Sequence, residues 1–152
     1  MDIERILNEN LIDLEMNVKT KNEAIQSLTN LLVSVGNIDN SELFIKDVYA
    51  REAEGKTGLG NHIAIPHGKS DAVKITSIAV GRTRNGLVWE SHDNLPVHVI
   101  ILFAVRNIDK TTVHLKLLSQ VAIALADDET IEKLLTTNNK TEVIKLLSNK
   151  MH

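Results

Sequence analysis

Histidine side chains offer the most versatile chemistry in this sequence, which has six histidines and no cysteine. Without a thiol, polar chemistry near neutral pH must run through imidazole or carboxylate groups. His67 stands out because it follows Pro66, which fixes the backbone, and precedes Gly68, which allows close approach. It comes directly after the apolar segment 63–66, so we expect it at a strand end, where α/β proteins usually bind ligands. The same context also allows a structural turn histidine that merely caps the strand.

Two further residues are candidates for the same chemistry. His114 falls in the first turn of a helix expected over 112–126, where free backbone amides and the helix dipole favour an anion such as a phosphoryl group. Arg51 lies on or beside the apolar stripe of a helix expected over 41–54. Each also has a structural interpretation: a helix-start histidine bonded to a carbonyl, or an arginine whose stem packs on the core.

A metal site is the main chemical alternative. His62, His67, His114 and Asp71 supply suitable ligand types. The spacing is against it, since the sequence has no His-x3-His pair, cysteine pair or carboxylate-rich calcium loop. The glycines at 55, 58 and 60 follow a helix and enter a strand, which is the reverse of the order in nucleotide-binding glycine motifs. We therefore expect neither a metal nor a cofactor.

The other four histidines and the pair of glutamates are weaker candidates for chemistry. His62 precedes the expected strand and is a candidate to line the same site as His67. His98 lies inside an expected strand, where a hydrogen-bonded core histidine is the default. His92 is expected in an exposed loop, and His152 is the end of the chain. The pair Glu52 and Glu54 is expected to form a solvated helix face, because residues two apart do not converge on a helix.

The elements that must position these residues follow from hydrophobic periodicity and from glycine and proline. Thr20 and Glu23 fit a capping box, and Gly36 ends the helix that follows. We expect strands at 75–80 and 87–89 joined by a tight hairpin turn at Asn85-Gly86, a central strand at 97–105, and a deeply packed helix at 112–126. The other expected elements are helices at 20–35, 41–54, 129–136 and 141–149 and a strand at 63–66. The order predicts one α/β domain with a mixed parallel and antiparallel sheet of about five strands, flanked by helices on both faces.

Composition narrows the class of protein. A chain of 152 residues suits a single domain, and its net charge of −3 comes from interspersed acids and bases without a basic block. Nucleic acid is therefore not an expected partner. No apolar run approaches the roughly 20 residues that span a bilayer, so no direct membrane insertion is expected. The N-terminus lacks the features of a secretory signal, which together with the absence of cysteine suggests the cytoplasm.

Residues 51–69 resemble the active-site signature of enzyme IIA proteins of the fructose/mannitol family, from the bacterial phosphoenolpyruvate-dependent sugar phosphotransferase system. The pattern is an acidic residue, six positions, and then Leu59-Gly60-x-x-Ile63-Ala64-Ile65-Pro66-His67-Gly68. The block 114–119 is similar to a second conserved segment of that family. The resemblance covers essentially the whole chain, residues 1–152, as one type 2 enzyme IIA domain. Residues 68–71 look more like the fructose and nitrogen-regulatory branches than the galactitol branch.

The resemblance implies a function and the residues that perform it. His67 would accept a phosphoryl group on Nε2 from the phosphocarrier HPr, with Arg51 and His114 beside it, and no cofactor would be needed. The group would pass to a IIB domain, and through it to the membrane IIC component, for coupled sugar uptake and phosphorylation. The alternative is a nitrogen-related regulatory phosphoprotein that acts by binding target proteins. The sequence identifies neither the sugar nor the oligomeric state.

Overall fold

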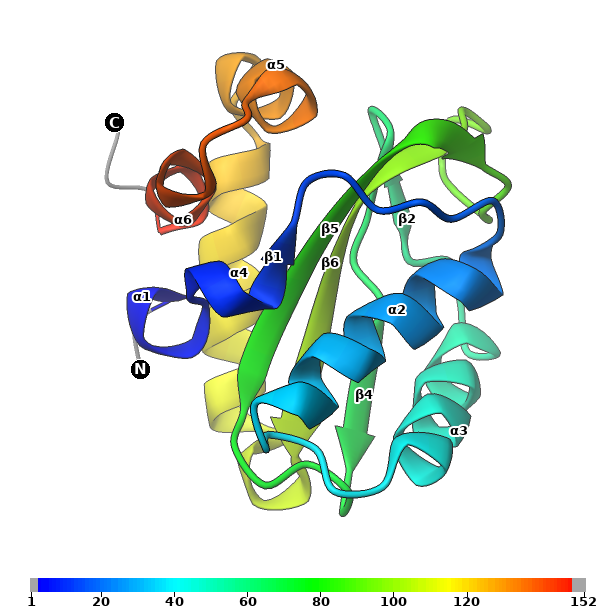
Figure 1. Ribbon diagram of the computed structural model, residues 1–152, viewed down its shortest axis with the longest axis vertical. Helices are drawn as coiled ribbons and strands as arrows, with labels where there is room; N and C mark the ends of the chain where they lie inside the picture. The colour runs from blue at the N-terminus through cyan, green and yellow to red at the C-terminus, as the bar shows by residue number, and fades with distance from the viewer. Residues whose placement is uncertain (1–2, 149–152) are drawn as a thin grey trace.

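The computed structural model describes residues 3–148 as a mixed six-stranded β-sheet between two layers of helices (Figure 1). The strand order is β1-β5-β6-β3-β2, and β4 pairs with β6. The helices are α1 (Ile3–Ile6), α2 (Lys21–Ser34), α3 (Ser41–Glu52), α4 (Thr112–Leu125), α5 (Asp128–Thr136) and α6 (Lys140–Leu147), with 3-10 turns η1 (Glu9–Leu11) and η2 (Asn107–Asp109). The strands are β1 (Ile12–Asp13), β2 (Gly58–Gly60), β3 (Ile63–Ala64), β4 (His67–Ser70), β5 (Ser77–Leu87) and β6 (Val97–Arg106). The predicted mixed α/β architecture is confirmed.

Strand β6 is the centre of the sheet, as its continuous apolar sequence predicts. It pairs antiparallel with β5 on one side and parallel with β3 and β4 on the other. Residues 99–105 of β6 are at most 1% exposed. A strand covered on both faces needs apolar side chains in both directions, which explains why this segment lacks alternation.

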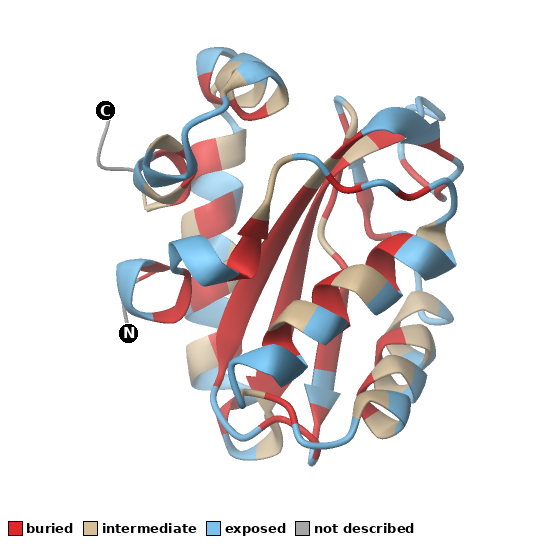
Figure 2. Ribbon diagram, viewed as in Figure 1, coloured by how far each residue is buried: buried red, intermediate tan, exposed pale blue. Residues whose placement is uncertain are grey.

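The helices form one layer on each side of the sheet. Helices α2 and α3 cover one face of the sheet, and α1, α4, α5 and α6 lie on the other side (Figure 1). Figure 2 shows the central parts of the strands buried, and the far end of β5 and the outer turns of the helices exposed. None of the helices within residues 3–148 is long and apolar enough to cross a membrane.

Helix α2 forms as its capping residues predict. The Thr20 hydroxyl oxygen accepts from the Glu23 amide at 3.1 Å, and the Glu23 carboxylate accepts from the Lys19 amide at 3.0 Å. These bonds satisfy amides that have no partner inside the helix. Gly36 follows the helix with φ of +82°, a conformation that glycine adopts without strain.

The predicted hairpin at Asn85-Gly86 is wrong, because β5 runs through both residues and pairs with β6 instead. Neither residue has the positive φ that the tight turn requires. The Asn85 side chain donates to the Val18 carbonyl at 2.8 Å, while a Cβ at Gly86 would lie 2.8 Å from the Pro96 ring. Asn85 therefore ties β5 to the preceding loop, and Gly86 allows Pro96 to approach.

Helix α4 is less buried than predicted. Its buried residues form one stripe, His114, Leu117, Val121 and Ala124. On the outer side, Leu115 is 64% and Ile123 is 58% exposed. This helix has apolar residues on several sides, but protein covers only one of them. The N-terminal elements α1 and β1 and the short strand β2 were not predicted, since each is too short for a periodic pattern.

Candidate functional site

His67 is the first residue of β4, whereas the sequence predicted it at the end of the strand at 63–66. The predicted strand at 63–66 is divided: β3 covers Ile63–Ala64, and pairing with β6 resumes at His67, which lies opposite Phe103. Pro66 separates the two strands because it has no amide to donate. Its carbonyl still accepts from the Phe103 amide at 3.0 Å, so the chain continues beside β6 and places His67 within the sheet.

The two predicted histidines meet over the ring of Phe103. The His67 and His114 ring centroids are 5.1 Å apart, although the residues belong to β4 and α4. Phe103 contacts both rings edge-on, at 5.7 Å from His67 and 6.2 Å from His114. Phe103 is fully buried and fixes both imidazoles. Sequence reasoning missed this residue, because nothing in an apolar strand marks one aromatic ring as the support of a site.

The two ring nitrogens of His67 have different environments. Nδ1 is buried without a hydrogen-bond partner, and the same is true of Nδ1 in His114. Nε2 is not among the buried unpaired atoms, although His67 as a whole is only 4% exposed. The nitrogen that faces the surface is therefore Nε2.

Burial and positive charge keep His67 neutral. Burial is the main cause that lowers the pKa of His67, and the charge of Arg51 lowers it further. The carbonyl groups of Ile65 and Pro66 oppose this change, although neither makes a well-aligned hydrogen bond to Nδ1. A neutral imidazole has a free lone pair, which is what a nucleophile requires.

Burial lowers the pKa of His114 to about 4, and repulsion from a protonated His67 and from Lys69 and Arg51 acts in the same direction. His114 is only 2% exposed, so solvent screens these charges poorly. Both imidazoles are therefore neutral at pH 7 and can accept a group that brings negative charge.

The lowered pKa of His114 predicts a pH-dependent stability. Between pH 6.5 and about 4 the unfolded chain protonates His114 while the folded chain does not, so stability falls as the pH is lowered through this range. The full effect is on the order of 3 kcal/mol, and His114→Gln should remove it. Urea unfolding at a series of pH values measures this slope. His92→Gln, at an exposed loop position, is the matched control, and an unchanged slope in His114→Gln would contradict the prediction.

Arg51 and Lys69 bring positive charge to the histidine pair. Arg51 lies in the last turn of α3 and donates from Nη1 to the Gly55 carbonyl at 3.2 Å. It lines an open depression of about 250 Å³ together with Lys69 of β4. Lys69 and His67 are two apart on a strand and point to the same face. Lys69 was not among the predicted site residues, and its place two positions after His67 was the available signal.

A cluster of polar side chains that extends from the interior to the surface holds the chain beyond Arg51. Thr57 donates to the Glu52 carboxylate and accepts from the Trp89 indole, both at 3.0 Å. Lys21 pairs with Glu52 at 2.6 Å and with Glu90 at 2.8 Å, above the Trp89 ring. The side chain of Glu52 is only 7% exposed, so its predicted place on a solvated face is wrong. This cluster fixes the end of α3 and the segment that leads to β2.

Gly68 lies directly beneath α3. A Cβ at this position would lie 2.5 Å from Phe44 Cε1 and 2.8 Å from Val48 Cγ2. Both residues are fully buried in α3. The absence of a side chain at Gly68 therefore lets α3, which carries Arg51, pack against the strand that carries His67.

His62 does not join His67, contrary to the sequence interpretation. Its carbonyl accepts from the amides of His98 and Val99, which lie about 13 to 17 Å along β6 from Phe103. His62 and His98 instead contact each other edge-on at 5.5 Å. The metal alternative that needed His62 beside His67 and His114 therefore loses one ligand. Within residues 3–148 no three histidine or carboxylate residues gather to hold a metal ion.

The remaining histidine predictions have mixed outcomes. His98 is half-buried and its Nδ1 donates to the Thr83 carbonyl at 2.9 Å, so it is hydrogen-bonded as predicted but lies in a groove rather than in the core. His92 is exposed in a loop, as predicted. His152 lies outside the described residues.

Comparison with known proteins identifies a family model that covers nearly the whole chain. The profile of the family "Phosphoenolpyruvate-dependent sugar phosphotransferase system, EIIA 2" matches residues 5–150. The chain belongs to this family. The predicted resemblance to fructose/mannitol-type enzyme IIA is confirmed.

Relatives of this IIA protein include both separate and fused components. A fructose-specific EIIA component from Haloferax volcanii is 33% identical over 147 residues, which are 97% of this chain and 95% of that protein. The 2-O-alpha-mannosyl-D-glycerate-specific EIIABC component of Escherichia coli K12 is 32% identical over 151 residues. That match covers 99% of this chain but only 23% of the larger protein, so the chain spans about a quarter of the fused relative.

Two solved structures share the fold of this IIA protein. The nitrogen regulatory protein IIA-Ntr from Neisseria meningitidis matches with a TM-score of 0.87 and 32% identity, over 95% of this chain and 98% of that one. Enzyme IIA-mannitol in complex with phosphorylated enzyme IIB-mannitol, from Escherichia coli, matches with a TM-score of 0.78 and 28% identity, over 94% and 97% of the two chains.

Proposed function

We propose that this IIA protein is a phosphoryl carrier of a sugar phosphotransferase system, and that residues 1–152 act as one unit. In this proposal His67 receives a phosphoryl group from the phosphohistidine of HPr and passes it to a IIB domain. The observation that carries the proposal is the neutral His67 imidazole, whose Nε2 faces the surface, with the His114 ring beside it and the charges of Arg51 and Lys69 acting on it. We place this relay in the cytoplasm.

The reaction is a displacement at phosphorus that needs no metal or cofactor. The Nε2 lone pair of His67 attacks the phosphorus atom, and the bond from phosphorus to the donor histidine breaks. The electron pair of that bond returns to the donor imidazole, while Nδ1 of His67 keeps its proton. The phosphorus–nitrogen bond formed on His67 retains enough transfer potential for a second displacement, by a side chain of the IIB domain.

Three residues would stabilise the phosphoryl group as it moves. The guanidinium of Arg51 has further N–H groups beyond the one bonded to Gly55, and a charged hydrogen bond contributes about 1.5 to 3 kcal/mol. Lys69 adds a second charge that acts on both imidazoles. His114, close to His67 and in the first turn of α4, would donate to a phosphoryl oxygen, and its pKa would rise as negative charge arrives.

Exposed apolar residues beside the site suit brief contacts with partner proteins. Ile108 is 79% exposed and lies in η2, the turn before α4. Leu115 is 64% exposed and is the next residue after His114 in α4. Leu59 of the signature segment is 39% exposed, whereas Ile63 of the same segment is buried in the sheet. We propose that Ile108 and Leu115 contact HPr and the IIB domain in turn. The complex of a related IIA with phosphorylated IIB supports the second partner.

A regulatory function is the second candidate, because the IIA-Ntr structure from Neisseria meningitidis matches this chain with a TM-score of 0.87. Such a protein would use the same histidine but act by binding targets. The two functions differ in where the phosphoryl group goes next.

A relay experiment distinguishes these functions. Labelled phosphoenolpyruvate, enzyme I and HPr should phosphorylate the protein, giving a label that is lost in acid and kept in base. We expect fructose-type or mannitol-type IIB domains to remove this label, and membranes with the matching IIC component to move it to sugar. Labelling that no IIB domain discharges would reject the uptake function and favour the regulatory one. Absence of labelling by HPr would reject both.

A further inference from the structure

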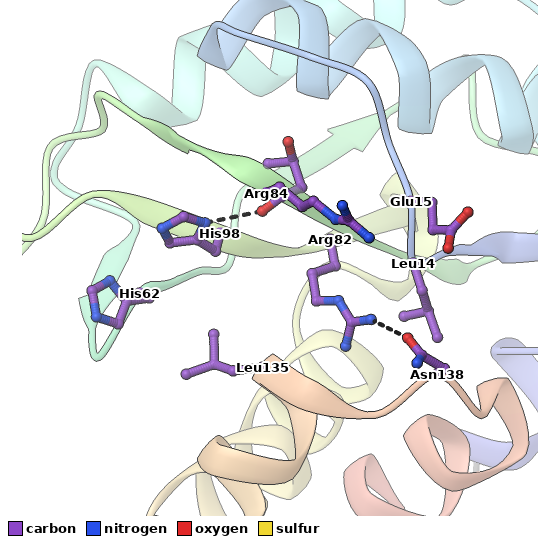
Figure 3. Close-up of a pocket in the computed structure, with 9 residues that line it drawn as sticks. Leu14, Glu15, His62, Arg82, Arg84, His98, Leu135 and Asn138 are labelled. Atoms are coloured by element: carbon purple, nitrogen blue, oxygen red, sulfur yellow. Dashed lines mark hydrogen bonds between the residues drawn. The ribbon is translucent and has the colours of Figure 1, made fainter.

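An open groove of about 290 Å³ lies at the other end of the sheet from His67. Figure 3 shows side chains from separate parts of the chain around it: Glu15 after β1, His62 beside β3, Arg82 and Arg84 of β5, His98 of β6, and Asn138 before α6. None of these residues belongs to the proposed phosphoryl site. The volume is close to the lower limit of pockets that bind small molecules.

The groove concentrates positive charge in a chain whose net charge is −3. Arg82 and Arg84 are two apart on β5, and only Glu15 among the lining residues is acidic. Burial lowers the pKa of Arg82, Glu15 opposes this effect, and repulsion from Arg84 adds to it. Two guanidinium groups held together with one carboxylate leave a positive charge that an anion would compensate.

The Arg82 guanidinium is held in position with hydrogen-bonding capacity to spare. Nη1 donates to the Leu134 carbonyl at 3.2 Å and Nη2 to the Asn138 side chain at 3.0 Å, as Figure 3 shows for Asn138. An arginine has five N–H groups, so three remain for a ligand. A fixed guanidinium loses little entropy when it binds a phosphate through two bonds.

The two histidines of the groove are oriented by backbone carbonyls. Nδ1 of His62 donates to the Pro96 carbonyl at 2.8 Å, and Nδ1 of His98 donates to the Thr83 carbonyl at 2.9 Å. The opposite nitrogen, Nε2, makes no bond to another residue within 3–148, so it remains available in each ring. Such a pair can accept hydrogen bonds from hydroxyl groups through Nε2.

The backbone that presents His62 is strained. Asn61 and His62 have φ of 55° and 70°, in the left-handed region that non-glycine residues rarely adopt. The Asp93 carboxylate accepts from the Asn61 amide at 2.8 Å and holds this turn. Strain of this kind persists where the surrounding structure enforces it, and it is concentrated at functional sites.

We propose that this groove binds a small phosphate monoester of a sugar or polyol, with Arg82 and Arg84 on the phosphate. The imidazoles of His62 and His98, together with Glu15 and Asn138, would contact the hydroxyl groups. The combination of the fixed Arg82 guanidinium, the second guanidinium of Arg84 and hydrogen-bonding side chains fits such a ligand better than a bare anion, for which the histidines and Asn138 would be unnecessary. The site is separate from His67, so it does not depend on the proposed phosphoryl relay.

Titration with fructose 1-phosphate, followed by the NMR signals of the histidine rings, tests this proposal. We expect saturable shifts at His62 and His98 with little change at His67. Inorganic phosphate should bind at least about tenfold more weakly and fructose should not bind at all. No saturable shift with fructose 1-phosphate, or equal binding of fructose, would overturn the proposal. Equal binding of inorganic phosphate would show an anion site without sugar recognition and would overturn it also.

Variants identify the residues responsible. Arg84→Gln, at an exposed position, should weaken binding about tenfold or more without affecting the fold. Arg82→Gln should weaken it at least as much, although it also loses bonds to Leu134 and Asn138. Lys46→Gln, which removes an exposed cation from α3 in the other helical layer, is the matched control. Binding unchanged in Arg84→Gln and Arg82→Gln would overturn the proposal, and phosphorylation by HPr should remain normal in Arg84→Gln.

Discussion

Replacement of His67 with glutamine is expected to reduce phosphorylation by HPr at least about 10³-fold, because the side chain that forms the covalent bond is lost. Glutamine has nearly the volume of histidine, so the contacts of this buried position with Phe103 are largely kept. The measurement is incorporation of label from phosphoenolpyruvate in the presence of enzyme I and HPr. Circular dichroism of the variant confirms that the fold is intact.

Two further variants, His92→Gln and Arg51→Gln, are compared with His67→Gln in this experiment. His92→Gln removes an exposed loop histidine and should leave labelling unchanged. Arg51→Gln keeps the nucleophile but loses a charged hydrogen bond, so transfer should be about 10- to 100-fold slower while the final extent of labelling is kept. Labelling of His67→Gln at the wild-type level would place the phosphoryl group on another residue and reject the mechanism.

The residues predicted from sequence were those with a local reason for their position. Thr20 and Gly36 bound a helix through bonds within a few residues, and Pro66 interrupts a strand by its own covalent structure. The run 97–105 predicts a buried strand because burial on both faces excludes polar residues. His67 and His114 were each identified from their own local sequence. Only the family resemblance implied that they lie side by side, as their ring centroids do at 5.1 Å.

Errors arose where tertiary contacts decide the structure. Asn85-Gly86 has the composition of a tight turn, but the bond from Asn85 to Val18 and the approach of Pro96 to Gly86 favour an extended strand. His62 is only five residues from His67, yet β3 and β4 follow β6 and carry the two histidines to separate ends of the sheet. Proximity in sequence predicts proximity in space poorly along a strand, where each residue adds about 3.3 Å.

Substitution of Gly68 by alanine is expected to lower the free energy of unfolding by about 2 kcal/mol, with a fall in Tm of roughly 4 to 8 °C. The new methyl group would lie 2.5 Å from Phe44 Cε1, 2.8 Å from Val48 Cγ2 and 2.9 Å from Phe44 Cζ, distances that require α3 or β4 to move. Transfer should slow as well, because either movement separates Arg51 from His67. Thermal and urea unfolding measure the first effect, and the rate of labelling by HPr measures the second.

Gly55→Ala is the matched control for this prediction, since a Cβ at Gly55 has no neighbour within 4 Å and its φ is not positive. This variant should keep its stability and its transfer rate. Val48→Ala in the Gly68→Ala background removes one of the two conflicting side chains, so the double variant should lose less than the sum of the single losses. If Gly68→Ala were as stable as the wild type, the packing of α3 against β4 would not require glycine. If the double variant regained stability but not its transfer rate, the position of α3 would not control the reaction at His67, and the proposed contribution of Arg51 would be rejected while that of His67 remained.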